Sequence, residues 1–355
     1  NLITIKSIQS IAGNNTGIGV NALCKNTTGT YNTALGTQSG LYSTTANNNT
    51  ALGFQAMKKN TTGAANTTTG SQAFLENTTG ANNTASGYIA LQNNTTGCRN
   101  TAVGSHALQD NTTGDYNTAV GQGTLKNNTT AVANTGVGYE ALVTSTTGTK
   151  NTSLGYQSSY NLTTGSENTV AGWAALLDNT TASYNTAFGN EALRSTTTAN
   201  GNTAVGYRGL LTNTTGSSNT ASGYCSLALN TTGNQNTATG FDALNANTTG
   251  TQNAAIGMCA LGRNTTGSCN TASGYRAMWR NTGSGNNTAM GNGVLCMNDG
   301  GLHNTAIGGL AMRFNATGCR NTASGYYAMG KNTTGCYNVA NGYYALADNT
   351  TANQN

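Results

Sequence analysis

A glycine recurs at every seventeenth position from Gly19 to Gly342, without a single insertion or deletion. The residue four positions before each of these 20 glycines is always asparagine, from Asn15 to Asn338. The consensus repeat is N-T-A-x-G-x-x-A-L-x-x-N-T-T-G-x-x, and we number its positions 1 to 17 from the invariant asparagine. A fixed period of this kind predicts an architecture in which each repeat packs against its sequence neighbours.

The repeats account for nearly the whole chain. Residues 15–354 hold 20 copies of 17 residues, and Asn355 begins a further copy. Residues 1–14 do not fit the repeat, and the alternation of apolar and polar residues in L-I-T-I-K-S-I-Q predicts a strand. We therefore expect an N-terminal cap or junction strand at 1–14, and a repeat array at 15–355 that continues beyond the last residue.

The length and composition of the repeat predict an all-β fold. Helical repeats need about 30–45 residues, because two helices must pack on each other. Asparagine, threonine and glycine dominate the repeat and are poor helix formers. Seventeen residues instead suit one coil of a parallel β-solenoid, stacked about 4.8 Å above the previous coil. The constant phase also argues against disorder, because a slip of one residue would turn side chains to the wrong face.

Variation among the 20 copies indicates which positions are packed. Position 3 is alanine in 15 copies, position 8 is mostly alanine, and position 9 is leucine, methionine or phenylalanine in 18 copies. Of the 25 charged residues, 23 fall at positions 7, 10, 11, 16 or 17, which are therefore expected to be solvent-exposed corners. The stretches between them, at positions 1–4, 8–9 and 12–14, would then form the sides of a two- or three-sided coil. The invariant glycine at position 5 indicates a backbone conformation or a close approach that needs glycine.

The invariant asparagine at position 1 predicts a structural ladder. In stacked coils each amide can donate to one neighbour and accept from the other, which removes the penalty of burying it. We take the following residues as representative of this ladder: Asn15, Asn32, Asn49, Asn100, Asn117, Asn202, Asn219, Asn321 and Asn338.

The asparagine at position 12 has two interpretations. Followed by Thr-Thr, it matches the acceptor pattern for N-linked glycans. Alternatively it forms a second buried ladder, an interpretation that Leu162, which replaces it in one copy, supports. The candidate glycan acceptors are Asn26, Asn60, Asn77, Asn94, Asn111, Asn128, Asn179, Asn213, Asn230, Asn247, Asn264, Asn315, Asn332 and Asn349.

Two further positions carry apolar side chains that one narrow coil does not need for its core. Position 4 is aliphatic or phenylalanine in about half of the copies, and position 6 is aromatic in 11 copies. Such side chains would form either a stacked row open to solvent or an interface between chains. We favour the interface, because a thin solenoid gains much from covering it.

Few residues suggest chemistry. The ten acidic residues are scattered, and the two histidines, His106 and His303, lie far apart at corner positions. The turn-like sequence N-D-G-G at 298–301 occurs once, whereas calcium-binding solenoids need an aspartate in every coil. We therefore expect no catalytic, cofactor-binding or metal site and no enzymatic activity. The net charge of +5 is spread thinly, and no run of 18 apolar residues exists, so we expect neither nucleic-acid binding nor a membrane span.

The eight cysteines contain no C-x-x-C pair, which argues against a zinc site. Cys319 and Cys336 share position 16 in neighbouring coils, so their Cα atoms would lie near 4.8 Å apart, within reach of a disulfide. Cys225 and Cys259 share a position two coils apart, about 9.6 Å, which is too far for a bridge. Cys319 and Cys336 are therefore the candidate disulfide.

The N-T-A-x-G-x-x-A-L phrase, carried for example by N-T-A-V-G-Y at 202–207, resembles the repeats of bacterial and phage fibre proteins. It is more loosely similar to the heads of trimeric autotransporter adhesins, whose x-A-x-G-x-x-A repeats form stacked β-rolls. The likeness covers 15–355, although the adhesin repeats are shorter and lack the N-T-T-G half seen at 213–216. The resemblance implies an extracellular, oligomeric, surface-attached fibre without a catalytic site.

Two hypotheses of function follow. The first is a structural subunit of an extracellular fibre or adhesin stalk, located outside the cell or on a cell or virion surface, that associates with further copies of itself by coil stacking and through its apolar face. The alternative is a binding module whose repetitive surface recognises a polysaccharide, such as a surface glycan, or ice. Adjacent threonines such as Thr112 and Thr113 should point to opposite faces, which disfavours flat threonine ranks for ice.

Overall fold

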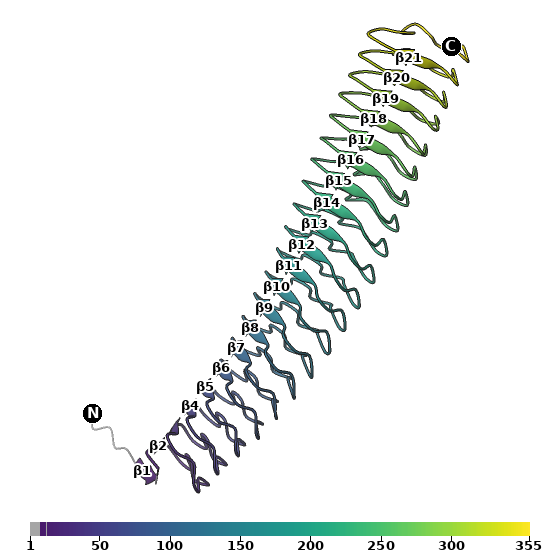
Figure 1. Cartoon of the computed structure of the whole chain (residues 1–355). Helices are drawn as coiled ribbons and strands as arrows, with labels where there is room; N and C mark the ends of the chain where they lie inside the picture. Colours follow the sequence, from purple (N-terminus) through teal and green to yellow (C-terminus); the bar gives the residue numbers. More distant parts are fainter. Residues whose placement is uncertain (1–7, 12) are drawn as a thin grey trace. The chain divides into compact units, whose positions relative to one another are not determined.

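The computed structural model describes residues 8–11 and 13–355, and it divides into two compact units, Asn1–Thr181 and Ala182–Asn355. We call these the N-terminal and the C-terminal unit and describe each by itself. The described residues contain strands, turns and bends but no helix. Within each unit the strands of successive coils lie side by side (Figure 1).

In the N-terminal unit, consecutive strands from β2 to β11 pair in parallel, and partners such as Thr101 and Thr118 are 17 residues apart. A first strand, β1 (Ile8–Ile11), pairs antiparallel with β2 (Asn15–Ile18). It lies in the segment where a cap or junction strand was expected, of which residues 1–7 and 12 fall outside the described residues. The other strands are β3 (Thr33–Leu35), β4 (Thr50–Leu52), β5 (Thr67–Thr69), β6 (Thr84–Ser86), β7 (Thr101–Val103), β8 (Thr118–Val120), β9 (Thr135–Val137), β10 (Thr152–Leu154) and β11 (Thr169–Ala171).

The C-terminal unit repeats this arrangement, with β12 to β21 paired in parallel at the same spacing. Its strands are β12 (Thr186–Phe188), β13 (Thr203–Val205), β14 (Thr220–Ser222), β15 (Thr237–Thr239), β16 (Ala254–Ile256), β17 (Thr271–Ser273), β18 (Thr288–Met290), β19 (Thr305–Ile307), β20 (Thr322–Ser324) and β21 (Val339–Asn341). The predicted all-β parallel solenoid with one coil for each 17-residue repeat is confirmed.

Of the three expected sides, only positions 2–4 form a strand, whereas positions 6–11 form turns and positions 13–14 bends. The reason is the backbone at positions 7 and 9, which is left-handed although these residues are rarely glycine. In one coil His106 has φ 61° and Leu108 has φ 50°. An extended strand cannot contain such residues, so the chain turns back there.

Backbone hydrogen bonds between coils continue outside the strands. The N–H of Leu108 donates to the carbonyl of Thr124 in the next coil at 3.0 Å, and that of Thr112 donates to Thr129 at 2.9 Å. The turn backbone is thus satisfied by the neighbouring coil, as buried peptide groups require. Because turns and strands are both in register, an inserted residue would break many of these bonds at once, which accounts for the constant repeat length.

The core of each coil is narrow. Along a strand the position-3 side chain points inward while positions 2 and 4 point outward, as the buried Ala102 between Thr101 and Val103 shows. The position-9 residue provides the large core side chain; Phe74 and Leu108, for example, are fully buried. Each such side chain contributes roughly 1.5–3 kcal/mol by leaving water.

The invariant glycine at position 5 has both a positive φ and a close contact with the backbone of the next coil, and each of these favours glycine. Gly206 has φ +128°, and a Cβ built on it would lie 2.5 Å from the carbonyl oxygen of Gly223 in the next coil. A side chain there would be strained by the backbone angle and blocked by the neighbouring backbone.

Candidate functional site

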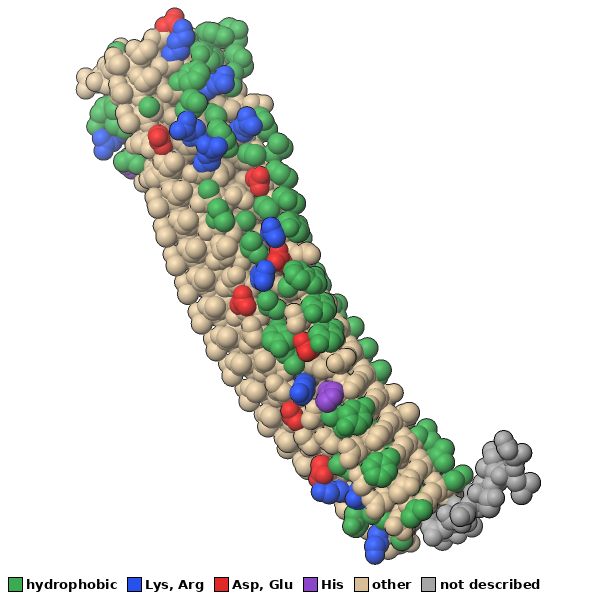
Figure 2. All heavy atoms as spheres, turned by 180° about the vertical axis from the view of Figure 1, so that it is seen from behind, with side chains coloured by type: hydrophobic (Ala, Val, Ile, Leu, Met, Phe, Trp, Pro, Cys, Tyr) green, Lys and Arg blue, Asp and Glu red, His purple; other side chains and the backbone are tan. Residues whose placement is uncertain are grey.

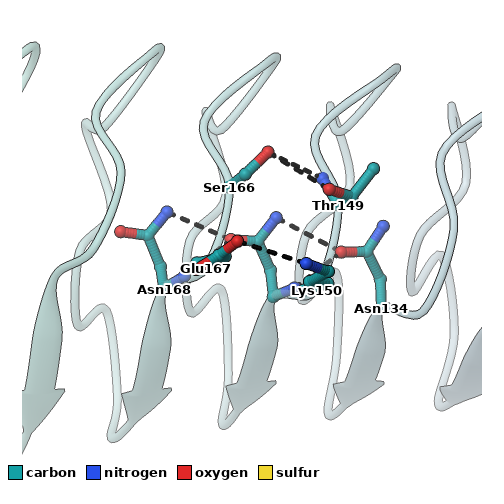
Figure 3. Close-up of polar contacts among 7 residues, drawn as sticks. Asn134, Thr149, Lys150, Ser166, Glu167 and Asn168 are labelled. Carbon is teal, nitrogen blue, oxygen red and sulfur yellow. Dashed lines mark hydrogen bonds and ion pairs between the residues drawn. The ribbon is translucent and has the colours of Figure 1, made fainter.

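The position-1 asparagines form a continuous ladder within each unit. Asn117 donates its backbone N–H to Oδ1 of Asn100 at 2.9 Å and its Nδ2 to the carbonyl of Ala131 at 2.8 Å. Its own Oδ1 accepts the backbone N–H of Asn134 at 3.0 Å. Figure 3 shows the amides of Asn134 and Asn168 in the same orientation, with one further asparagine between them.

All nine asparagines chosen from the sequence are buried in this ladder. Asn202 differs in one respect: its backbone N–H donates to Asn185 and its Oδ1 accepts from Asn219, but its Nδ2 has no hydrogen-bond partner. The ladder therefore binds neighbouring coils to one another and presents no group to a ligand. The nine residues are Asn15, Asn32, Asn49, Asn100, Asn117, Asn202, Asn219, Asn321 and Asn338.

The position-12 asparagines form a second ladder. Nδ2 of Asn111 donates to Oδ1 of Asn94 at 2.7 Å and to the carbonyl of Gly114 at 3.0 Å. Of the 14 candidate glycan acceptors, 12 are buried, and only Asn26 and Asn349 are half-buried. A glycan bonds to Nδ2, which here points into the coil, so the folded geometry fits the ladder interpretation and leaves no room for the sugar at the buried positions.

The threonines divide between the fold and the surface. At position 13 the hydroxyl donates to the next coil, as Thr112 Oγ1 does to the carbonyl of Thr129 at 3.0 Å. At position 14, Thr113 is exposed, and at position 2, Thr101 points outward from the strand. The surface thus carries two rows of threonine that repeat in nearly every coil; the exceptions are Ala254 and Val339 at position 2 and Gly283 and Gly300 at position 14.

Exposed apolar side chains at positions 4 and 6 form what we call the apolar strip. Along it the rings of neighbouring coils stack, with centroids 5.1 Å apart for Tyr139 and Tyr156 and 5.0 Å apart for Tyr207 and Tyr224. Although stacked, Tyr156 remains 45% exposed, and Figure 2 shows hydrophobic side chains along the molecular surface. The strip comprises Leu35, Phe54, Tyr88, Val103, Val120, Val137, Tyr139, Leu154, Tyr156 and Trp173 in the N-terminal unit, and Phe188, Val205, Tyr207, Tyr224, Phe241, Ile256, Met258, Tyr275, Met290, Ile307, Tyr326 and Tyr343 in the C-terminal unit.

Charged side chains pair between equal positions of neighbouring coils. Lys150 and Glu167 lie 3.3 Å apart at position 17 (Figure 3), and Lys59 and Glu76 lie 2.6 Å apart at position 11. Such exposed pairs are worth about 0–1 kcal/mol each. They place opposite charges next to each other on neighbouring coils.

Glu191 is the one buried carboxylate among these described pairs. Its oxygens accept from Arg208 Nε at 2.6 Å and from Arg194 Nη1 at 2.5 Å, and it is only 5% exposed. Burial alone would raise the pKa of Glu191, but the hydrogen bond and charge of Arg208, together with those of Arg194, outweigh burial and lower it. This cluster holds two coils together.

The structure places the two histidines apart. His106 Nδ1 lies 2.9 Å from Oε1 of Gln109, and its ring meets that of Tyr88 edge-on; His303 is exposed. In the N-D-G-G turn, Asn298 belongs to the position-12 ladder and Asp299 accepts from the hydroxyl of Thr282 at 2.5 Å. Across residues 8–11 and 13–355, no three His, Cys, Asp or Glu side chains gather in a way that could hold a metal ion.

The eight cysteines are present as free thiols. Cys319 and Cys336 lie together, with their Sγ atoms 2.8 Å apart, while the structure forms no bond between Cys225 and Cys259. The hydrogen bond with Cys336, followed by burial, raises the pKa of the Cys319 thiol. The candidate pair is therefore in place, and its oxidation stays a prediction.

Sequence reasoning missed one feature of the C-terminal unit, which we call the Arg–Trp groove. It is a surface hollow of about 420 Å³ around Gly262. Position 10 is occupied by Asn245, Gly262 and Trp279 in three successive coils. The missing side chain of the middle residue was the signal that could have located the groove. Its walls are formed by Asp242, Asn245, Cys259, Arg263, Arg276 and Trp279.

Searches of protein-family models and of curated proteins found no match to the chain. In the part of the chain that the structure describes, no helix is both long enough and apolar enough to cross a membrane.

Proposed function

We propose that this chain is a structural subunit of an extracellular fibre or adhesin stalk, and that it associates with further copies of itself. The observation that carries the proposal is the apolar strip. Its side chains occur in nearly every coil, remain 37–53% exposed over most of the strip, and stack between several pairs of neighbouring coils. Monomeric soluble proteins rarely leave a contiguous apolar surface of this extent uncovered.

The coil geometry supports a second mode of association, by stacking. Every described coil presents the position-1 asparagine to its neighbour, and most coils also present the position-12 asparagine, beside the paired strands. A coil of another copy could therefore pair in the same register, as unpaired strand edges do when nothing covers them. Only 7% of the residues are charged, which provides little like-charge repulsion against such stacking.

The experiment is electron microscopy and sedimentation velocity of the purified 355-residue chain over a range of concentrations. We expect laterally paired or bundled chains that become more abundant with concentration. Replacing Val120 and Leu154 by lysine should separate them, because each substitution places a charge on the apolar strip. Lysine at the exposed Thr113 and Thr130, at position 14, provides the matched control and should leave association intact. A chain that stays monomeric at every concentration would overturn the proposal.

The alternative, a repetitive binding surface, has one observation in its favour. The outward threonines at position 2 form a regular row beside the apolar side chains of position 4, as in β7 and β8. Shaping of ice crystals, or retention on an immobilised neutral polysaccharide, by a monomeric chain would favour this function over the fibre.

A further inference from the structure

We propose that the Arg–Trp groove of the C-terminal unit binds an acidic polysaccharide, a chain of sugar units that carry carboxylate groups. This goes beyond the structural function, because it gives the solenoid a specific ligand site on one part of its surface. The inference is based on the shape of the groove, on the unpaired arginines beside the indole, and on the mixture of polar groups along the walls.

The hollow exists because Gly262, at position 10 of its coil, has no side chain to fill the space. Asn245 and Trp279 occupy the same position in the coils before and after Gly262. A Cβ on Gly262 would lie 3.2 Å from Cδ1 of Trp279, tighter than an ordinary contact. The glycine therefore both opens the groove and lets the half-buried indole lie close against the backbone of the neighbouring coil.

The arginines of the groove are positioned by stacking on aromatic rings and not by ion pairs. The guanidinium carbon of Arg263 lies 4.3 Å from the centre of the Trp279 ring, and that of Arg276 lies 5.3 Å from it. Arg276 also stacks on Tyr275 at 5.2 Å. A guanidinium stacked on an aromatic face keeps its N–H groups free to bind a carboxylate with two parallel hydrogen bonds.

No acidic side chain of the described residues lies within ion-pair distance of these arginines, although both are exposed. Elsewhere the chain pairs such charges between coils, as Lys59 does with Glu76. An anion from outside the chain is thus the natural partner for Arg263 and Arg276.

The basic surface extends beyond a single hollow, which favours a polymer over a small molecule. Arg280 follows Arg263 at position 11 of the next coil and lines a second hollow of about 200 Å³, whose walls also include Met297, Phe314 and the carboxylate of Asp299. Arg313 stacks on Phe314 at 5.1 Å. Figure 2 shows basic side chains gathered among hydrophobic ones on this unit. The coil spacing of about 4.8 Å is close to the length of one sugar unit.

The walls favour a sugar polymer over a nucleic acid. The carboxylate of Asp242 and the amide of Asn245 lie in the same groove as the arginines. Asp242 repels any anion, but its oxygens can accept hydrogen bonds from the hydroxyls of a polysaccharide, which a DNA backbone does not offer. Single-stranded nucleic acids also need successive bare aromatic faces for their bases, whereas the Trp279 ring already has a guanidinium over it.

The test uses polygalacturonate as the probe and dextran as a neutral polymer. The chain has two tryptophans, so a Trp173→Phe background makes Trp279 the sole indole fluorophore. We expect a saturable change in its fluorescence with polygalacturonate and none with dextran. The Arg263→Gln/Arg276→Gln double variant should raise the Kd about ten-fold or more. Trp279→Ala, measured by calorimetry, should do the same.

The matched control is Arg99→Gln/Arg320→Gln, which removes the same charge and also breaks two arginine–aromatic contacts, here over Tyr116 and Tyr337. It should change the Kd by less than about two-fold. Three results would overturn the proposal: no saturation with polygalacturonate, an equal loss of binding in both double variants, or tighter binding of a single-stranded oligonucleotide. Repeating the titration with the Val120→Lys/Leu154→Lys chain separates this proposal from self-association, because the groove lies within one chain and should bind equally well there.

Discussion

The side-chain nitrogen of Asn111 donates a 2.7 Å hydrogen bond to the side-chain oxygen of Asn94, 17 residues earlier. In turn, the oxygen of Asn111 accepts from Nδ2 of Asn128 at 2.6 Å. Each of these amides is fully buried, and Asn94 and Asn111 are both donor and acceptor. This run of hydrogen bonds ends at Asn128, whose Oδ1 has no partner because the next coil has Ser145 at the same position. Bonds linked in this way strengthen one another in a low-dielectric interior.

Replacing Asn111 with leucine should therefore destabilise the protein. The change leaves Nδ2 of Asn128 without its asparagine acceptor and Oδ1 of Asn94 without its donor. An unsatisfied buried group costs about 1–3 kcal/mol. Urea unfolding of the variant should show this loss, whereas Asn127→Leu, at a half-buried position of the next coil, should change stability by less than about 0.5 kcal/mol. Equal effects would contradict the ladder.

Two glycines of the C-terminal unit allow the cost of backbone strain to be measured apart from the cost of a steric clash. Gly206 and Gly201 both have positive φ, at +128° and +66°, but only Gly206 would bring a Cβ against the next coil. We expect Gly206→Ala to cost more than about 2 kcal/mol, because the collision adds to the strain. Gly201→Ala should cost about 1 kcal/mol or less, since other coils place residues such as Ser218, with φ 58°, at the same position. Thermal unfolding of both variants measures the difference.

The buried carboxylate of Glu191 predicts a dependence of stability on pH. Its pKa in the folded chain is lowered from the ordinary 4.5, so its contribution is fully present above that pH and disappears as the carboxylate is protonated at lower pH. Glu191→Gln should cost about 1 kcal/mol at pH 7, because both arginines are partly exposed and screened by solvent.

The difference between the wild-type chain and Glu191→Gln should shrink as the pH falls below 4.5. Glu76→Gln is the control, since its pair with Lys59 is exposed, and it should have a smaller effect. A difference for Glu191→Gln that is the same at acidic and neutral pH would show that the ion pairs do not stabilise the coil.

The thiols of Cys319 and Cys336 should form the disulfide within one chain when the folded protein is treated with oxidised glutathione. Their Sγ atoms are already 2.8 Å apart, so little movement is needed. Closing a loop of this length should stabilise the chain by about 3 kcal/mol. Titration should show the eight free thiols fall to six, and peptide mapping should join these two residues. A bridge between Cys225 and Cys259 would instead contradict the coil stacking.

Part of this fold could be predicted because each repeat experiences nearly the same surroundings. Internal variation identified Ala102 and Leu108 as packed, and the structure buries both. The same comparison suggested that glycine at position 5 is required, and Gly206 shows the φ and the close approach that require it. For position 12, comparison left two interpretations open, because a buried ladder and a glycan acceptor use the same residues.

The sequence by itself determined the period, the parallel stacking and the packed positions, because a repeated residue must meet its own copy one coil away. It was wrong about position 7, which was expected to be a solvent-exposed corner but holds the buried Glu191 and Ile89. Only the tertiary structure decided that one stretch of each coil is a strand and the rest turns, since left-handed residues such as Leu108 carry no glycine to reveal them. It also decided that Asn111 points inward, which depends on the path of the whole coil. The Arg–Trp groove likewise arises only in three dimensions, because Asp242, Gly262 and Trp279 come from three coils that stacking brings together.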